Sequence, residues 1–208
     1  MTKEFDLGTI DLAQAYALIT RVVAPRPIAL VSSRSAAGQG NLAPFSYFMA
    51  GGANPPSCVI CPMRTHTGVL KDTARNIEET GEYVINVCTA PMAERVNRCS
   101  FDYPRGVDEM ERSGFTPIAS RRVRPPRVAE SPIQLECRLH RIVPHGCGPL
   151  SSNYIIGEIL HLHVAEEVLG PEGLPDDAKI PFIARLGASW YARVDPECLF
   201  EMARPREP

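Results

Sequence analysis

A proline within an apolar stretch marks the first place where this sequence could do chemistry. The segment Asn41–Ser46 reads Asn-Leu-Ala-Pro-Phe-Ser. Pro44 has no backbone N–H, so within a strand it belongs at a sheet edge or a bulge, where free backbone groups can meet a ligand. Asn41 and Ser46 add polar groups and Phe45 adds an aromatic surface, a mixture that suits a planar heteroaromatic ligand. The alternative is an edge strand whose proline prevents pairing with other chains.

A second cluster combines two cations with the start of a predicted helix. Arg64 lies before the helix, and Lys71 is followed by Asp72 and Thr73. A helix N-terminus offers unpaired N–H groups and the positive end of a dipole, which together favour phosphate. Arginine grips phosphate with paired hydrogen bonds, and lysine acts as a point charge. The alternative is a capped surface helix with ordinary salt links.

The other reactive side chains are better explained by a role in the fold than by catalysis or metal binding. Cys58 and Cys61 have Cys-x-x-Cys spacing, but residues three apart in a strand point to opposite faces, so we expect core thiols. His161 and His163 share one face of a strand and fit a polar outer face or packed core histidines better than a metal pair. The sequence contains no Gly-x-Ser-x-Gly motif and nothing that indicates a hydrolytic triad or a carboxylate pair. We therefore predict no metal site and no protein nucleophile.

Bulk composition narrows the class of protein. The 208 residues suit a single domain, which we expect to span 1–208. A net charge of −2 gives no pull toward nucleic acid, and the basic stretch Arg121–Arg127 contains two prolines typical of a solvated linker. No apolar run approaches the ~20 residues that span a bilayer, and no signal region opens the chain. We expect a cytoplasmic protein that binds neither membrane nor nucleic acid and whose seven cysteines stay reduced.

The elements that must position these residues are mostly strands. Helices are predicted over 11–20, 67–80 and 91–99, each with a start or stop signal. Residues 100–131 and 169–181 are predicted to be irregular. Strands are predicted over 28–33, 41–50, 57–61, 82–88, 133–143, 154–164 and 185–194. Strands joined largely by turns favour a mainly β fold, an antiparallel barrel that is closed or nearly closed with a few flanking helices.

A series of segments then fits one known family in order along the chain. The upstream members are Val23–Ser32, Gly40–Phe48, Pro55–Pro56 and Lys71–Ile77. The downstream members are Gly106–Glu109, Glu130–Pro132, Leu135–Cys137, Gly157–Glu158 with His163, and Arg185–Gly187 with Tyr191. From about residue 14 to residue 194, the chain resembles the flavin reductase-like, FMN-binding split-barrel family, which includes the flavoredoxins. The tail after Pro196 lies outside the resemblance.

The resemblance implies an antiparallel split β-barrel, usually a homodimer, that holds flavin mononucleotide (FMN) near the dimer interface. The strand would lie along the flavin ring and the helix start would hold the phosphate. The implied cofactor-binding residues are Asn41, Ala43, Pro44, Phe45, Ser46, Arg64, Lys71, Asp72 and Thr73. Arg26 would either reach the flavin or support its loop, and Trp190 would either stack on flavin or fill the dimer interface.

The implied activity is electron transfer, for which the flavin itself carries the chemistry. NADH or NADPH would reduce the flavin, which would pass electrons to a partner monooxygenase, a metal ion, free flavin or a small organic acceptor. Two alternatives stay open. One is a non-enzymatic FMN electron carrier, and the other is a flavin-binding module without redox turnover.

Overall fold

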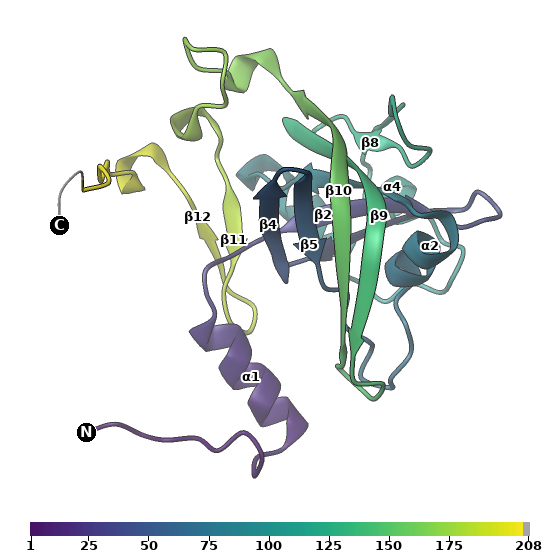
Figure 1. Ribbon diagram of the computed structural model, residues 1–208, viewed down its shortest axis with the longest axis vertical. Helices are drawn as coiled ribbons and strands as arrows, with labels where there is room; N and C mark the ends of the chain where they lie inside the picture. The colour runs from purple at the N-terminus through teal and green to yellow at the C-terminus, as the bar shows by residue number, and fades with distance from the viewer. Residues whose placement is uncertain (206–208) are drawn as a thin grey trace.

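The computed structural model describes residues 1–205, and its centre is a seven-stranded antiparallel sheet (Figure 1). The strand order is β3-β2-β6-β9-β10-β5-β4, while β1, β11 and β12 form a smaller sheet and β7 pairs with β8. The strands are β1 Arg26–Pro27, β2 Ala29–Arg34, β3 Gly40–Phe45, β4 Phe48–Ala53, β5 Pro56–Ile60, β6 Glu82–Val87, β7 Pro117–Ile118, β8 Arg127–Val128, β9 Ile133–His145, β10 Ser152–Val164, β11 Ile183–Arg185 and β12 Tyr191–Arg193. The α-helices are α1 Leu12–Val22, α2 Asp72–Thr80, α3 Ala93–Arg98 and α4 Glu109–Arg112.

The sheet curls into a barrel because its two edge strands are neighbours in the chain. β3 and β4 stand at opposite ends of the strand order, yet only Ser46 and Tyr47 separate them. Two residues span only ~7 Å, so the two edges must approach each other at this point. We call this junction the seam. The mainly β, antiparallel split-barrel fold is thus confirmed, but the single strand predicted over 41–50 is wrong, because the chain breaks at the seam and changes edges.

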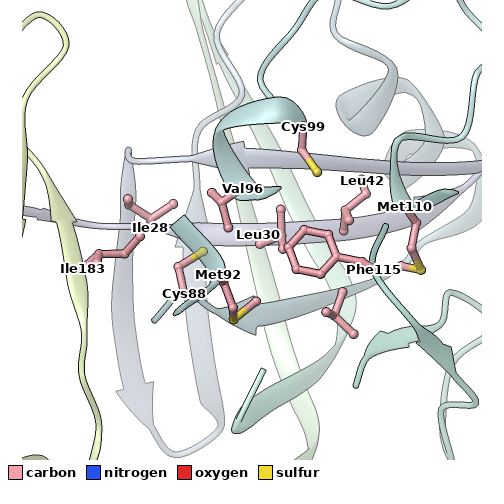
Figure 2. Close-up of a cluster of buried hydrophobic side chains, with 11 residues drawn as sticks. Ile28, Leu30, Leu42, Cys88, Met92, Val96, Cys99, Met110, Phe115 and Ile183 are labelled. Atoms are coloured by element: carbon pink, nitrogen blue, oxygen red, sulfur yellow. The ribbon is translucent and has the colours of Figure 1, made fainter. Parts of the chain in front are cut away.

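Both faces of β2 are buried, which gives the barrel two apolar clusters. Side chains alternate between the faces of a strand, so Ala29 and Val31 point one way and Leu30 the other. The first face packs with Tyr83 and other side chains of the barrel strands, and α2 adds Ile77. Figure 2 shows the second cluster, in which strand, helix and loop side chains surround Phe115. This cluster fixes α3 and α4 against β2 and β3.

The helix predictions hold in outline and differ at the boundaries. α1 begins after Asp11, whose carboxylate accepts the backbone N–H of Gln14, as its capping residue type predicted. The helix predicted over 67–80 begins only at Asp72, because Gly68 adopts φ +82° within a turn. The helix predicted over 91–99 is a 3-10 turn at Ala90–Met92 followed by α3.

Predicted and observed elements differ more in the second half of the chain. Residues 185–194 were predicted as one strand, but they contain the turn between β11 and β12, in which Ala188 adopts φ +53°. The segment predicted to be irregular over 100–131 contains α4, β7 and β8. α1 and the β11–β12 hairpin stand together on one side of the barrel (Figure 1). The backbone of Gly187 is so close to Arg21 that a Cβ at Gly187 would overlap the arginine side chain.

His163 makes a structural contact with a buried carboxylate. Its Nε2 lies 2.6 Å from Oε1 of Glu136, which is fully buried in β9. The carboxylate also accepts the backbone N–H groups of Arg121 at 2.8 Å and Arg122 at 2.6 Å. Burial raises the pKa of Glu136, but the bonds from Arg121, His163 and Arg122 outweigh it and leave the pKa below its ordinary value. The arginine-rich stretch is therefore fastened to the barrel rather than being a free linker.

Replacing Glu136 by Gln should lower the free energy of unfolding by about 2–3 kcal/mol at pH 7, because a buried N–H group loses its acceptor. Since the folded-state pKa is depressed, the ionised carboxylate stabilises the fold fully above the ordinary value of about 4.3. That stabilisation is lost as the pH falls through the folded-state pKa. Urea unfolding at pH 7 and below pH 4 should therefore show the difference between Glu136→Gln and wild type shrinking on acidification.

The matched control is Glu158→Gln, because Glu158 forms an exposed pair with Arg138 at 3.1 Å. Such pairs contribute at most about 1 kcal/mol. A Glu136→Gln variant no less stable than this control would contradict the structural role of the buried carboxylate.

Candidate functional site

All nine predicted binding residues line one cavity of about 330 Å3 at the seam. A volume near the lower end of the ~300–1,000 Å3 range of small-molecule sites suits a ligand that is only partly enclosed. The nine residues are predicted to lie on a strand and around a helix start, and the structure brings these two groups together. The cavity is also lined by residues that were not predicted to bind the cofactor: Tyr16, Thr20, Tyr47, Cys61, Met63, Thr65, His66, Cys99, Ser100, Phe101, Asp102, Tyr103, Glu109 and Leu150.

The strand side of the cavity is the open edge of β3. β3 pairs with β2 on one side only, as the proline predicted. In an antiparallel pair alternate residues direct their backbone groups away from the partner. Leu42 is one of these, because its N–H is bound at 2.9 Å by the carboxylate of Glu109. Pro44 is the next, and it has no N–H to offer, so no further strand can extend the sheet here.

The helix side of the cavity is the first turn of α2. Lys71 is the N-cap residue and its side chain makes no capping hydrogen bond. Asp72 and Thr73 form the first turn, so their backbone N–H groups have no partner within the helix. The side-chain amide of Asn41 donates to Oγ1 of Thr73 at 2.8 Å and thereby joins β3 to α2. Asn41 thus positions the helix start relative to the strand.

Arg64 carries the clearest sign of a missing partner. Its Nη1 donates to the carbonyl of Gly68 at 3.0 Å, but its buried Nε has no hydrogen-bond partner. A buried donor without an acceptor costs ~1–3 kcal/mol, and charged donors cost more. Arg64 and Lys71 both line the cavity. An anionic group between them would therefore meet an unsatisfied guanidinium N–H and an ammonium.

Carboxylates balance these cations within the same cavity. Lys71 pairs with Asp102 at 2.8 Å, and Asp72 lies 3.5 Å from Arg75 of its own helix. Burial raises the pKa of Glu109 even though the Leu42 N–H opposes that shift. A phosphate at the helix start would compete with Asp102 for Lys71. The side chain of Asp72 is itself an anion, so Asp72 can bind the phosphate through its backbone N–H only.

An apolar hollow of about 280 Å3 adjoins the cavity and shares Tyr16, Tyr47, Cys61, Met63 and Leu150 with it. α1 forms one wall through Leu12, Ala15 and Ile19. Burial raises the pKa of the Tyr47 hydroxyl, which therefore stays protonated at neutral pH. The hollow offers aromatic and aliphatic contact beside the polar strand end.

Arg26 and Trp190, for which the sequence left two roles each, both lie outside the cavity wall. Arg26 is buried and does not line the cavity, but its Nε donates to Oγ of Ser46 at 3.3 Å. Trp190 lies in the β11–β12 turn, with 73% of its surface exposed, and is not part of the cavity wall. Cys58 and Cys61 are both buried, and the sulfur of Cys58 lies 3.8 Å from that of Cys137.

Across residues 1–205, no group of three or more His, Cys, Asp or Glu side chains is arranged to hold a metal ion. No helix within that range is long and apolar enough to cross a membrane.

The residues fit FMN in type and placement. The unsatisfied Nε of Arg64, together with Lys71 and the free first turn of α2, suits the phosphate. The unpaired edge of β3 and the side chains of Phe45 and Ser46 suit a planar ring with polar edges. Most of the additional cavity residues lie in segments without a motif, such as 99–103, which is why no sequence signal identified them.

Comparison with known proteins identifies the family. The family described as flavin reductase like domain matches residues 21–179. A protein of Halalkalibacterium halodurans without assigned function is 36% identical over 199 residues, which cover 95% of this chain and 94% of the relative.

Two solved structures are similar over nearly their whole length. Nitrilotriacetate monooxygenase component B from Bacillus cereus is 31% identical, with a TM-score of 0.90 and coverage of 97% of this chain and 99% of that chain. The 2-nitrobenzoate 2-nitroreductase NbaA of Pseudomonas fluorescens is also 31% identical, with a TM-score of 0.86 and coverage of 98% and 97%. On the family match, which spans well over half of the chain, this protein belongs to the flavin reductase-like domain family.

Proposed function

We propose that this protein binds FMN in the seam cavity and acts as an oxidoreductase, passing electrons from NADH or NADPH through the flavin to an acceptor. The observation that carries the proposal is the convergence of the nine predicted residues on one cavity, where the buried Nε of Arg64 lacks a partner. The family membership supports the same class of chemistry.

In this proposal the phosphate lies between Arg64, Lys71 and the first turn of α2. The flavin ring lies along Ala43–Ser46, with Phe45 supplying apolar contact. Bound flavin supplies the hydride and electron chemistry. The chain's own residues bind, orient and shield the flavin, so the proposal requires no protein nucleophile or general base.

The apolar hollow next to the cavity supports the enzymatic reading. Its wall of tyrosine, methionine and aliphatic side chains offers room for a nicotinamide or an organic ring beside the seam. The names of the relatives suggest two kinds of acceptor, a partner monooxygenase and a nitroaromatic compound. We propose that the acceptor of this protein belongs to one of these kinds.

A homodimer is part of the proposal because α1 leaves its apolar face uncovered. Leu12, Tyr16 and Ile19, which share one face of the helix, are 51%, 40% and 38% exposed. Trp190 adds exposed aromatic surface in the β11–β12 turn, whose Gly187 lies against Arg21 of α1. Exposed apolar groups gathered in this way are typical of interaction surfaces.

The phosphate assignment predicts a selective loss of affinity. Removing both cations with Arg64→Ala and Lys71→Ala should weaken FMN at least ~100-fold, because each charge-assisted hydrogen bond contributes about 1.5–3 kcal/mol. Riboflavin, which lacks the phosphate, should lose far less. Fluorescence titration of both flavins measures this, and the double variant Arg138→Ala with Lys179→Ala controls for lost charge elsewhere. Equal loss of FMN and riboflavin would contradict the assignment.

The enzymatic proposal predicts steady oxidation of NADH or NADPH. The FMN-loaded protein, kept anaerobic with excess acceptor, should consume one of the two nucleotides over many turnovers. Absorbance at the nicotinamide band measures the rate. A flavin that a separate reductase can bleach, but that neither nucleotide reduces, would replace the enzyme with the electron-carrier alternative. A flavin that stays oxidised with every donor would favour a binding module without turnover.

The dimer proposal predicts a shift in mass. Sedimentation should show a dimer for the wild type, and Ile19→Glu should shift it toward monomer because a charge would be buried at the interface. Leu174→Glu is the control, since Leu174 is an exposed apolar residue (64%) of the loop over 169–181 and does not belong to α1. A wild-type monomer at micromolar concentration would contradict the proposal.

A further inference from the structure

Arg26 is a buried cation whose partners are all neutral. It is only 5% exposed. Its Nη1 donates to the carbonyl oxygens of Thr20 at 2.5 Å and Val23 at 2.6 Å, and its Nη2 donates to that of Leu186 at 2.9 Å. Of the ion pairs formed by residues 1–205, none includes Arg26. The guanidinium is therefore well hydrogen-bonded, yet no carboxylate neutralises it.

The carbonyl partners solvate this charge without cancelling it. Thr20 and Val23 lie at the C-terminal end of α1, where free carbonyl groups carry partial negative charge. Such dipoles stabilise a cation, but they leave its full unit charge in place. In surroundings of low polarity an uncancelled charge acts on its neighbours more strongly than it would in water.

A further hydrogen bond connects this charge to the cavity. Nε of Arg26 donates to Oγ of Ser46 at 3.3 Å. Since the serine oxygen accepts this bond, the hydroxyl hydrogen of Ser46 points elsewhere. Within residues 1–205 that hydrogen has no protein acceptor, and Ser46 lines the cavity wall at the seam. The Ser46 hydroxyl is therefore free to donate to a ligand in the cavity, and a buried cation lies on its other side.

We propose that Ser46 donates a hydrogen bond to a carbonyl oxygen of the flavin ring, and that Arg26, acting through Ser46, favours the reduced flavin. The inference rests on the proposed FMN site and adds a tuning role to it. Reduction places negative charge on the ring, and charges or hydrogen bonds near the ring set how readily it is reduced. A donor polarised by an uncancelled cation binds the more negative form more strongly. Arg26 is thus a positioning residue, and Ser46 makes the contact.

A purely structural role for Arg26 would look different. The same guanidinium joins α1 to the β11–β12 hairpin, so a loss of stability in an Arg26 variant would not test the proposal. The midpoint potential of the bound flavin does test it, because the potential reports the ratio of affinities for reduced and oxidised FMN. A merely structural contact would change both affinities alike and leave the ratio unchanged.

The experiment compares Ser46→Ala with wild type by titrating oxidised and reduced FMN and by measuring the potential spectroscopically. We expect Ser46→Ala to keep most of its affinity for oxidised FMN and to bind reduced FMN about tenfold more weakly. For a two-electron couple that ratio makes the potential about 30 mV more negative. Ser46→Thr, which keeps a hydroxyl, should restore the wild-type potential. Ser120→Ala is the matched control, because that hydroxyl donates to the carbonyl of Pro125 at 2.6 Å and does not line the cavity.

A second variant tests the relay. Arg26→Lys keeps the charge but loses the Nε–H that reaches Ser46, so it should shift the potential in the same direction as Ser46→Ala. In the Ser46→Ala background it should add nothing, which is the mark of two residues acting as one unit. An additive effect would contradict the relay. If Arg26→Lys does not fold, the Ser46→Ala and Ser46→Thr pair still decides the proposal.

The outcomes separate this inference from the proposed function. A wild-type protein that binds no FMN would overturn both. A protein that binds FMN but shows an unchanged or more positive potential in Ser46→Ala would overturn only the tuning role.

Discussion

Pro44 has no backbone N–H, and it occupies the edge of β3 that faces away from β2. No strand can be added there, so the two edges of the curled sheet meet at the seam without pairing. Backbone groups that a continuous barrel would use for strand pairing are left available at this seam. The chain itself fixes the location, because only Ser46 and Tyr47 connect the two edge strands.

The groups around the seam are held by bonds that do not themselves need a ligand. Asn41 joins the strand to the start of α2, and Glu109 holds the outer N–H of Leu42. Arg26 fastens α1, the β11–β12 hairpin and Ser46 to one point. With the frame fixed in this way, the first turn of α2 and the side chain of Arg64 line a common cavity. Such preorganisation lowers the entropy cost of binding a ligand.

Local sequence signals predicted much of this arrangement. The proline in an apolar segment indicated a sheet edge, and two cations before a helix indicated a phosphate site. Both sets of residues line the same cavity. The predicted boundaries of two elements were wrong. The seam divides the strand predicted over 41–50, and the turn at Gly68 moves the start of α2 to Asp72. Gly68 is a local turn signal, whereas the seam crossing at Ser46 and Tyr47 has no local pattern that distinguishes it from a continued strand.

Long-range contacts could not be predicted. Nothing in the local sequence around Arg26 indicates that it binds the carbonyl of Leu186, which lies 160 residues away. The same is true of Asp102 and Glu109, which reach the cavity from a segment predicted to be irregular. His163 was ambiguous until the fold placed the buried Glu136 beside it. In each case the partner is set by the topology of the barrel rather than by spacing along the chain.

The most direct test of the central claim is the absorption spectrum of the purified protein, followed by titration with FMN. The account predicts flavin bands that saturate at one FMN per chain and that change in position and shape relative to free FMN. A protein that shows no flavin bands and binds no added FMN would contradict it.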